Sequence, residues 1–285
     1  MRTIAHISDL HFGRIDPPVA EGLVADLAQH KPDLLVISGD LTQRSRRSQY
    51  ADAMTFLSKL PTPQLVVPGN HDIPLWNIAE RIFSPVRKYT EMVTDNLRPI
   101  FEDDEMLVIG LNSARSFTRT SGWLSREQLS FAEKRFAAGR GKFKVLVTHH
   151  PFIPPPRRPD SDVIRGGRRY LETLNAVNVD LLLAGHLHLA YHDDLRSHFK
   201  SSERGVLSIQ AGTATSTRRR GEPNAYNWIT VSPALCTVAV RAWADGAFKE
   251  SLITRYECHT AGWRPVTQVP LDEAGAQMAT DASGD

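Results

Sequence analysis

The chain has 285 residues, of which 41% are hydrophobic and 23% charged, with a formal net charge of +2. These values are typical of a globular protein and give no overall nucleic-acid signature, so we expect no stable nucleic-acid partner. Two cysteines are too few for a disulfide framework or a structural zinc site. The sequence starts on a strand-like pattern and holds no apolar run of about 18 residues. We therefore expect a cytoplasmic protein whose contact with membranes is at most peripheral.

The first part of the chain alternates apolar runs with helical patterns. Apolar segments at 3–13, 34–42 and 64–72 indicate strands, and amphipathic stretches at 19–33 and 46–61 indicate helices between them. The run at 34–42 is continuously apolar, as in a strand buried on both faces. This order is typical of parallel strands joined by right-handed crossovers.

The rest of the chain continues this alternation and then changes to strands alone. Helices are predicted at 75–100, with an interruption at Pro85, at 125–138, and near 168–176. Ser125 and Gln128 form a capping-box pattern at the start of the second of these helices. Strands are predicted at 105–113, 142–152, 179–188, 205–216, 225–232, 237–244 and 248–256. With no repeat or linker in sight, we expect one domain over 1–270 and a disordered polar tail over 271–285.

Five of the predicted strands end in side chains that can bind metals. They are Asp9 with His11, Asp40 after Gly39, Asn70-His71-Asp72 after Gly69, His149-His150, and His186 with His188 after Gly185. Ligands of open α/β sheets bind beyond the carboxyl ends of the strands, which is where all five groups fall. Residues two apart on a strand share a face, so each Asp-x-His or His-x-His pair can approach one ion. We expect the glycines to permit the sharp turns required there.

The chemistry of these donors narrows the kind of site. They are imidazoles, carboxylates and an amide without a thiolate, a mixture that suits manganese, iron or zinc. Seven donors exceed the needs of one ion: Asp9, His11, Asp40, Asn70, His149, His186 and His188. They fit two divalent ions that share a bridging carboxylate, an arrangement that clamps both oxygens of a phosphoryl transfer. Each motif alone could be a solvated loop, and only their recurrence at five strand ends favours a site.

The motifs SDLHFG, SGDLT, PGNHD, THHPF and AGHLH resemble those of the calcineurin-like metallophosphoesterase superfamily, over residues 4 to about 244. Within it, the length and the spacing are most similar to the bacterial class III cyclic-nucleotide phosphodiesterase group. That group also includes glycerophosphodiesterases and phospholipase C-like enzymes. The resemblance implies an α/β fold, a four-layer α/β/β/α metallophosphoesterase sandwich with two mixed sheets.

The resemblance also implies a role for each motif residue. One metal would be held by Asp9, His11, Asp40 and His188. The other would be held by Asp40, Asn70, His149 and His186, with Asp40 bridging the two. A metal-bridging hydroxide would attack phosphorus in line. His71 would act near the phosphate as a general acid or stabiliser of the transition state, Asp72 would orient His71 or a neighbouring loop, and His150 would pack against or support the site.

The substrate stays open at this point. The main hypothesis is a cyclic nucleotide or a similar small phosphodiester. The alternative is a phospholipase C-like or glycerophosphodiester hydrolase that acts on phospholipid or headgroup diesters. A scaffold without activity would be expected to have lost ligands, and the motifs are complete.

Several loops contain residues that could choose between these substrates. Arginines could bind a second anionic group or an acidic membrane, or they could be ordinary solvated residues: Arg115, Arg119, Arg126, Arg157, Arg158, Arg165, Arg168, Arg169 and those of 212–228. Four aromatic residues could stack on a base, contact lipid or simply pack: Trp76, Trp123, Tyr226 and Trp228. The 75–100 segment is a candidate homodimer interface.

Overall fold

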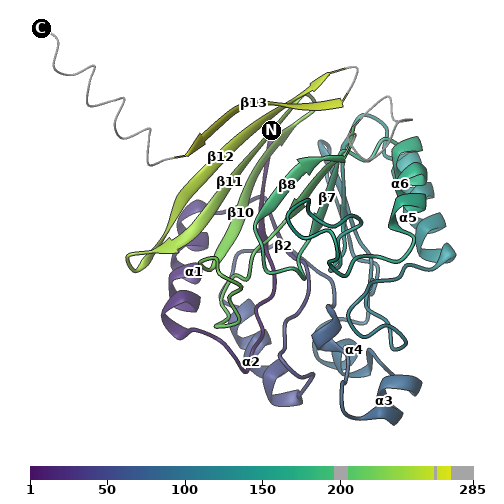
Figure 1. The fold of residues 1–285 in the computed structure, drawn as a ribbon, viewed down its shortest axis with the longest axis vertical. Coiled ribbons are helices and arrows are strands. Elements are labelled where there is room, and N and C mark those ends of the chain that lie inside the picture. Colours follow the sequence, from purple (N-terminus) through teal and green to yellow (C-terminus); the bar gives the residue numbers. More distant parts are fainter. Residues whose placement is uncertain (196–204, 260–261, 271–285) are drawn as a thin grey trace, which may run out of the picture.

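The computed structural model describes residues 1–195, 205–259 and 262–270 as two β-sheets flanked by helices (Figure 1). One sheet has seven strands in the order β13-β12-β11-β10-β1-β2-β3, and the other has six in the order β4-β5-β6-β7-β9-β8. Both sheets mix parallel and antiparallel pairs, which confirms the predicted α/β class with two mixed sheets. The tail expected to be disordered, 271–285, lies outside the described residues.

The first sheet is parallel on one side and antiparallel on the other. Its parallel strands β1 (Arg2–Ile7), β2 (Leu34–Ile37) and β3 (Gln64–Val66) alternate with helices α1 (Pro17–His30) and α2 (Arg47–Leu57), as predicted. The antiparallel strands are β10 (Ala225–Ser232), β11 (Leu235–Ala244), β12 (Ala247–His259) and β13 (Gly262–Pro270). The sequence analysis missed β13, because Pro265 within it is atypical of strands. An edge strand tolerates proline, and β13 is at the edge.

The second sheet is parallel in its centre and antiparallel at its edges. Its strands are β4 (Ile100–Glu102), β5 (Met106–Gly110), β6 (Phe143–Val147), β7 (Leu181–Ala184), β8 (Tyr191–Asp194) and β9 (Leu207–Gln210). Its helices are α5 (Arg126–Ala138) and α6 (Gly167–Ala176). The predicted capping box is confirmed, since Ser125 Oγ accepts from Gln128 N and the Gln128 side chain accepts from Ser125 N.

The interruption predicted at Pro85 within the helical stretch 75–100 is confirmed, but the outer bounds of that stretch were too wide. The stretch contains two short helices, α3 (Ile78–Phe83) and α4 (Arg87–Met92), and ends at strand β4. Ser84 separates the helices because a residue that precedes a proline, here Pro85, is disfavoured in helical conformation. None of the described helices combines the length and apolarity needed to cross a membrane.

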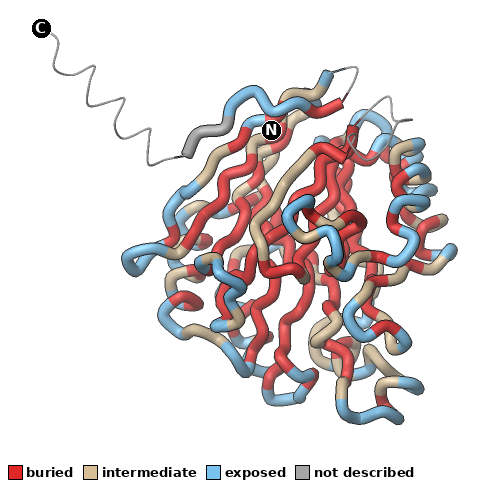
Figure 2. The backbone as a smooth tube through the Cα atoms, in the orientation of Figure 1, coloured by how far each residue is buried: buried red, intermediate tan, exposed pale blue. Residues whose placement is uncertain are grey.

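Three large hydrophobic cores lie between the layers, and β2 contributes to two of them. Leu34 and Val36 face the core between the sheets, while Leu35 and Ile37 face α1 and α2. A third core joins the outer face of the second sheet to α5 and α6. Figure 2 shows the central strands buried and the helices exposed on their outer sides. This layering aligns the ends of the parallel strands and leaves the loops beyond them free to form a site.

A buried ion pair ties α1 to the first sheet. Arg241 on β11 donates from Nη2 and Nε to the two oxygens of Asp26, at 2.7 and 2.9 Å. The Tyr226 hydroxyl donates to the same carboxylate. The side chains of Arg241 and Asp26 are each 10% exposed, so water replaces little of this interaction if one partner is removed.

We expect the Asp26→Ala substitution to lower the free energy of unfolding by about 3 kcal/mol, because it leaves a guanidinium buried without its carboxylate. Loss of one partner of a buried ion pair usually costs about 3–5 kcal/mol. We expect the lower figure here because Glu250, 3.5 Å from Arg241, still balances part of the guanidinium charge. Urea unfolding measures the change. In the control, Glu127→Ala removes a partner of Arg98 that is 80% exposed, with an expected loss of less than about 1 kcal/mol. Equal losses in the two variants would contradict this account.

Candidate metal centre

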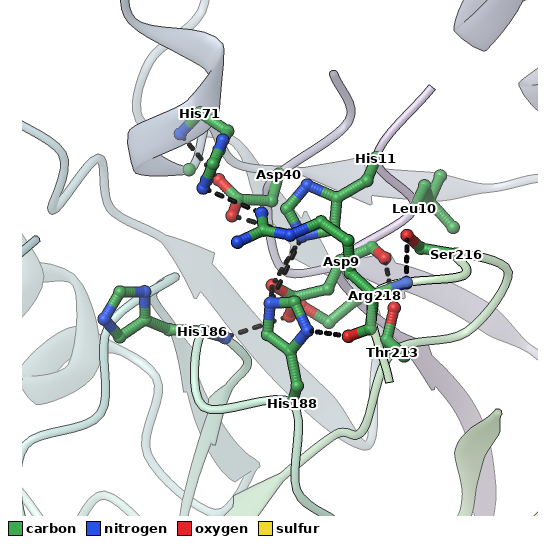
Figure 3. A network of polar contacts seen from close by, with 12 residues as sticks. Asp9, Leu10, His11, Asp40, His71, His186, His188, Thr213, Ser216 and Arg218 are labelled. Carbon is green, nitrogen blue, oxygen red and sulfur yellow. Dashed lines mark hydrogen bonds and ion pairs between the residues drawn. The ribbon is translucent and has the colours of Figure 1, made fainter. Parts of the chain in front are cut away.

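The predicted ligands meet in one region, although they come from strands of both sheets. The imidazole and carboxylate donors form overlapping groups of three residues. Within each group, the donor atoms lie within 4.8 Å of one another. Three of these groups are Asp9-His11-His188, Asp9-Asp40-His149 and His149-His150-His186. Figure 3 shows Asp9, His11, Asp40 and His188, which come from three loops, gathered around a common centre. Five motifs spread over about two thirds of the chain therefore build a single site.

The backbone at this site is strained rather than strand-like. The five residues Asp9, His11, Asp40, His186 and His188 have φ between 52° and 73°, in the left-handed region. Such conformations cost on the order of 1–3 kcal/mol each for residues other than glycine. The prediction that strand alternation brings Asp9 and His11 together was wrong, because β1 already ends at Ile7. The loop instead holds them, with Asp9 N and His11 N donating to the carbonyls of Gly39 and Asp40.

The motif glycines act differently from the prediction in two of three cases. Gly39 does adopt a positive φ of 98°. Gly69 has φ of −101°, and a Cβ there would lie 2.1 Å from Asp40 Oδ1. A Cβ on Gly185 would lie 1.8 Å from Ser8 Oγ. Gly69 and Gly185 are thus required because other motifs approach closely, and turn geometry is not the reason.

The first group of donors is a compact triangle. Asp9 Oδ1 lies 3.5 Å from His11 Nε2 and 3.2 Å from His188 Nε2, and the two nitrogens are 3.2 Å apart. Donors held about 2.1 Å from one ion at tetrahedral or octahedral angles are roughly 3.0–3.5 Å apart. His188 Nδ1 donates to the carbonyl of Arg218 at 2.8 Å, which leaves Nε2 with its lone pair toward the triangle. Asp9 Oδ1 is buried and has no hydrogen-bond partner among the described residues.

The second group has the same character. His149 Nδ1 donates to the carbonyl of Ser38 at 2.8 Å, so Nε2 faces the site. Nε2 is 3.1 Å from Asn70 Oδ1 and 3.4 Å from Asp40 Oδ1. Burial alone would lower the pKa of His149, but the Asp40 carboxylate outweighs it and raises the pKa to about 9. Without a metal, a proton on His149 thus supplies the positive charge that the surrounding oxygens attract.

Asp40 lies between the two groups. Its Oδ1 faces His149, and its Oδ2 is 3.6 Å from His11 Nε2. Burial would raise the pKa of Asp40, yet the neighbouring imidazoles, His149 above all, hold it well below its usual range. A permanently ionised carboxylate with one oxygen toward each group suits a bridging position.

His186 and His150 form an edge of the site. The His186 ring packs on His150 and His149, with centroids 4.5 and 5.1 Å apart, while its backbone N–H donates to Asp9 Oδ2 at 2.9 Å. His186 and His188 therefore point to different groups, and only His188 joins Asp9 and His11. His150 Nδ1 lies 2.8 Å from Ser113 Oγ, and its Nε2 is buried without a hydrogen-bond partner among the described residues. His150 was expected to pack against or support the site, and its ring nitrogen in fact lies within 4.8 Å of the donor atoms of His149 and His186.

Asp72 connects the loop that follows β2 to the loop that follows β3. Its carboxylate accepts from the backbone N–H groups of Leu41, Thr42 and Gly69 at 2.9–3.1 Å, and from the Thr42 hydroxyl at 3.0 Å. Burial and the nearby Asp40 charge raise the pKa of Asp72 to about 7, despite these hydrogen bonds. Of the two roles expected for Asp72, these contacts favour the one in which it holds a neighbouring loop.

His71 and Arg218 form the mouth of the site. His71 Nδ1 donates to the carbonyl of Gln43 at 2.9 Å, so Nε2 is the acceptor for the Arg218 guanidinium, also at 2.9 Å. Figure 3 shows the Arg218 side chain lying across the donor groups toward His71. The sequence analysis placed Arg218 in a candidate phosphate-binding loop but had no signal for its contact with His71, which is 147 residues away.

The donor set fits divalent metal ions. Imidazole lone pairs, carboxylates and an amide oxygen converge at the separations that a shared ion requires, and backbone carbonyls fix the tautomers of His149 and His188. In the absence of such ions, the buried carboxylate and amide oxygens and the imidazole lone pairs would face one another with only the proton on His149 to balance them, at a considerable cost in free energy. Asp9, Asp40 and His11 are at most 1% exposed, so water does little to relieve that cost.

Comparisons with known proteins agree with this geometry. A probable cyclic nucleotide phosphodiesterase of Synechococcus sp. is 27% identical over 66% of this chain and 74% of that relative. The glycerophosphodiester phosphodiesterase GpdQ of Enterobacter lignolyticus is 27% identical over 53% of this chain, which spans 57% of its length. A dimetal phosphatase from Danio rerio superposes with a TM-score of 0.61 at 13% identity, over 93% of this chain and 98% of that one, which shows a shared fold. Residues 2–190 match the model of the calcineurin-like phosphoesterase family, and the chain therefore belongs to that family.

Proposed function

We propose that this chain is a metal-dependent hydrolase that cleaves a phosphodiester bond in a cyclic nucleotide or a similar small diester. In this proposal residues 1–270 act as one metallophosphoesterase domain. The seven predicted ligands would hold two divalent ions, drawn from manganese, iron and zinc. Family membership and the names of the two curated relatives support the reaction class.

One observation carries the proposal beyond the family level. Beside the donor groups lies a cavity of about 640 Å³ whose lining includes the predicted ligand Asn70 and its neighbour His71. Five arginines line the same cavity: Arg14, Arg44, Arg46, Arg119 and Arg218. Guanidinium groups bind phosphate oxygens in a bidentate manner, so this cavity suits an anionic and polar substrate.

His71 and Arg218 would then act on the substrate at the cavity side of the site. When bound, the two metal ions would supply Lewis-acid stabilisation of the phosphate oxygens and an activated water nucleophile. Because Nδ1–H of His71 is committed to the Gln43 carbonyl, only Nε2 can face the substrate. Once Arg218 has moved from Nε2, that nitrogen would take up a proton from solvent and pass it to the leaving alkoxide. Arg218, which is half-buried beside Asp9 and Asp40, would exchange its contact with Nε2 for one with the substrate.

A second candidate is hydrolysis of a glycerophosphodiester or a phospholipid headgroup diester. The arginine-lined cavity favours those substrates of this class whose headgroup carries a further anionic group, since that group would use cations that a single diester leaves unpaired. The relation to GpdQ agrees with this candidate. Both candidates require the same metal centre and differ only in what fills the cavity.

We expect His71→Ala to retain as many bound metal ions as the unmodified chain but to lose roughly 10²- to 10⁴-fold in kcat, because a general acid is removed without a ligand. Metal content is measured by elemental analysis, and turnover with saturating diester. Asn70→Ala is the matched comparison from the adjacent position and should lose metal as well as turnover. If His71→Ala lost metal to the same extent, His71 would have to be counted among the ligands.

We expect Asp72→Asn to lower the free energy of unfolding by about 2–4 kcal/mol, because an amide N–H₂ would face backbone N–H donors in a buried site. Metal affinity should fall with it, since the loops that carry Asp40 and Asn70 would separate. Chemical unfolding and a competitive chelator titration measure the two effects. Asp52→Asn on the exposed side of α2 is the control and should change neither quantity. Unaltered metal affinity in Asp72→Asn would argue against a positioning role.

The substrate proposal is tested by kcat/KM of the manganese-loaded protein on cyclic AMP, glycerophosphocholine and phosphatidylcholine in mixed micelles. A preference for cyclic AMP of at least roughly tenfold would support the main proposal. A comparable preference for either of the others would replace it with the second candidate. Asn70→Ala serves as the background for contaminating activity. Absence of metal-dependent turnover on all three would reject both candidates.

A further inference from the structure

Helix α3 has the opposite orientation to an ordinary surface helix, with its charged side chains toward the protein and its apolar side chains toward solvent. Its charged side chains face the protein: Glu80 is buried and accepts from Lys88 Nζ at 2.8 Å. Arg81 donates to the backbone carbonyls of Pro74, Ser116 and Thr118. Its large apolar side chains, Ile78, Ile82 and Phe83, face outward. Figure 1 places this helix at the lower edge of the molecule, away from the strands.

Two further exposed apolar side chains, Trp76 and Phe117, lie beside Ile78 of this helix. We call Trp76, Ile78, Ile82, Phe83 and Phe117 the apolar tip; each is between 59% and 85% exposed. They are five of the eight large apolar side chains that are exposed among the described residues. Trp76, Ile78 and Phe117 also line one shallow cavity, and Arg81 fastens α3 to the loop that carries Phe117. Such a concentration of exposed apolar side chains marks a surface that binds something.

The apolar tip adjoins the arginine-lined cavity of the metal centre. Leu75 and Arg119 line both cavities, and the Arg44 guanidinium lies over the Trp76 ring at 6.0 Å. Among the described residues, no carboxylate forms an ion pair with Arg14, Arg44, Arg46 or Arg119. Glu80, already paired, is the only acidic residue in 73–84, and 113–120 has none. The surface therefore combines apolar side chains with unpaired positive charge.

We propose that the apolar tip docks this protein on an anionic phospholipid surface, with the arginine-lined cavity facing the lipid headgroups. Trp and large aliphatic side chains enter the boundary between headgroups and acyl chains, while nearby cations are attracted to anionic lipids. This docking places the opening of the metal centre where headgroup phosphates are concentrated. The docking itself does not depend on the proposed function. Only its consequence, that the metal centre is brought to the headgroup phosphates, rests on that function.

The alternative occupant is a second copy of this chain. A symmetric dimer through the tip would bring the same patch of both copies together. It would then bring two sets of unpaired arginines close together, which is unfavourable. An anionic lipid surface complements the same arginines. Charge therefore favours the membrane over the dimer.

The test is co-sedimentation with vesicles of phosphatidylcholine, with and without phosphatidylglycerol, at low and high salt. The protein carries Asn70→Ala throughout, so that lipid turnover does not alter the vesicles. We expect binding only with phosphatidylglycerol, and a partition coefficient lowered at least roughly tenfold by Ile82→Ser with Phe83→Ser. Arg44→Gln with Arg119→Gln should weaken binding and reduce its dependence on salt. Val266→Ser removes an exposed apolar side chain on β13 and should bind as the parent does.

Other outcomes would overturn the proposal. No sedimentation with either vesicle would do so, as would equal loss of binding in Val266→Ser. If Ile82→Ser with Phe83→Ser instead abolished a concentration-dependent dimer in sedimentation velocity, the tip would be an interface between copies. An unchanged melting temperature of each variant shows that it is folded. Because binding is measured without turnover, a chain that hydrolyses soluble diesters but ignores vesicles refutes only the docking.

Discussion

Asp40 is the residue on which the rest of the centre depends. Its carboxylate separates the Asp9-His11-His188 group from the group around His149, and each oxygen faces one of them. The same residue accepts from the backbone N–H of His71, so it also positions the loop that carries His71. A buried carboxylate in this position must remain ionised, and the imidazoles around it ensure that. The loops of both sheets can therefore approach only if the charges between them are balanced.

That electrostatic requirement explains the strained backbone. Five predicted ligands in left-handed conformation would together cost several kcal/mol, and they persist only when the surroundings leave no alternative. The surroundings here are closely packed backbones, with Gly69 against Asp40 and Gly185 against Ser8. Asp72 adds a buried clamp below the loops. The three layers of core behind the site supply the stability against which this strain is set.

Much of this arrangement could be predicted from the sequence, and the failures have definite causes. The continuous apolar run at 34–42 identified β2 as buried on both faces, and the capping box located the start of α5, because both signals are local. The positions of the donor side chains followed from strand ends alone. The left-handed backbone and the close approach of Gly185 could not be predicted, since they depend on contacts between loops far apart in sequence. The orientation of α3 was also hidden: a helical period gives the apolar face but does not say whether it points inward.

In the loop after β9, the backbone and the side chain of Arg218 make separate contacts with the site. Its backbone carbonyl at Arg218 fixes the tautomer of His188, and this contact needs no particular side chain. The Arg218 side chain alone reaches His71 and the cavity. A substitution at this position can therefore change the charge and shape of the cavity while the backbone contact that orients His188 stays intact. The side chain at position 218 can therefore vary without disturbing the metal centre, because this residue is hydrogen-bonded to His188 only through its backbone.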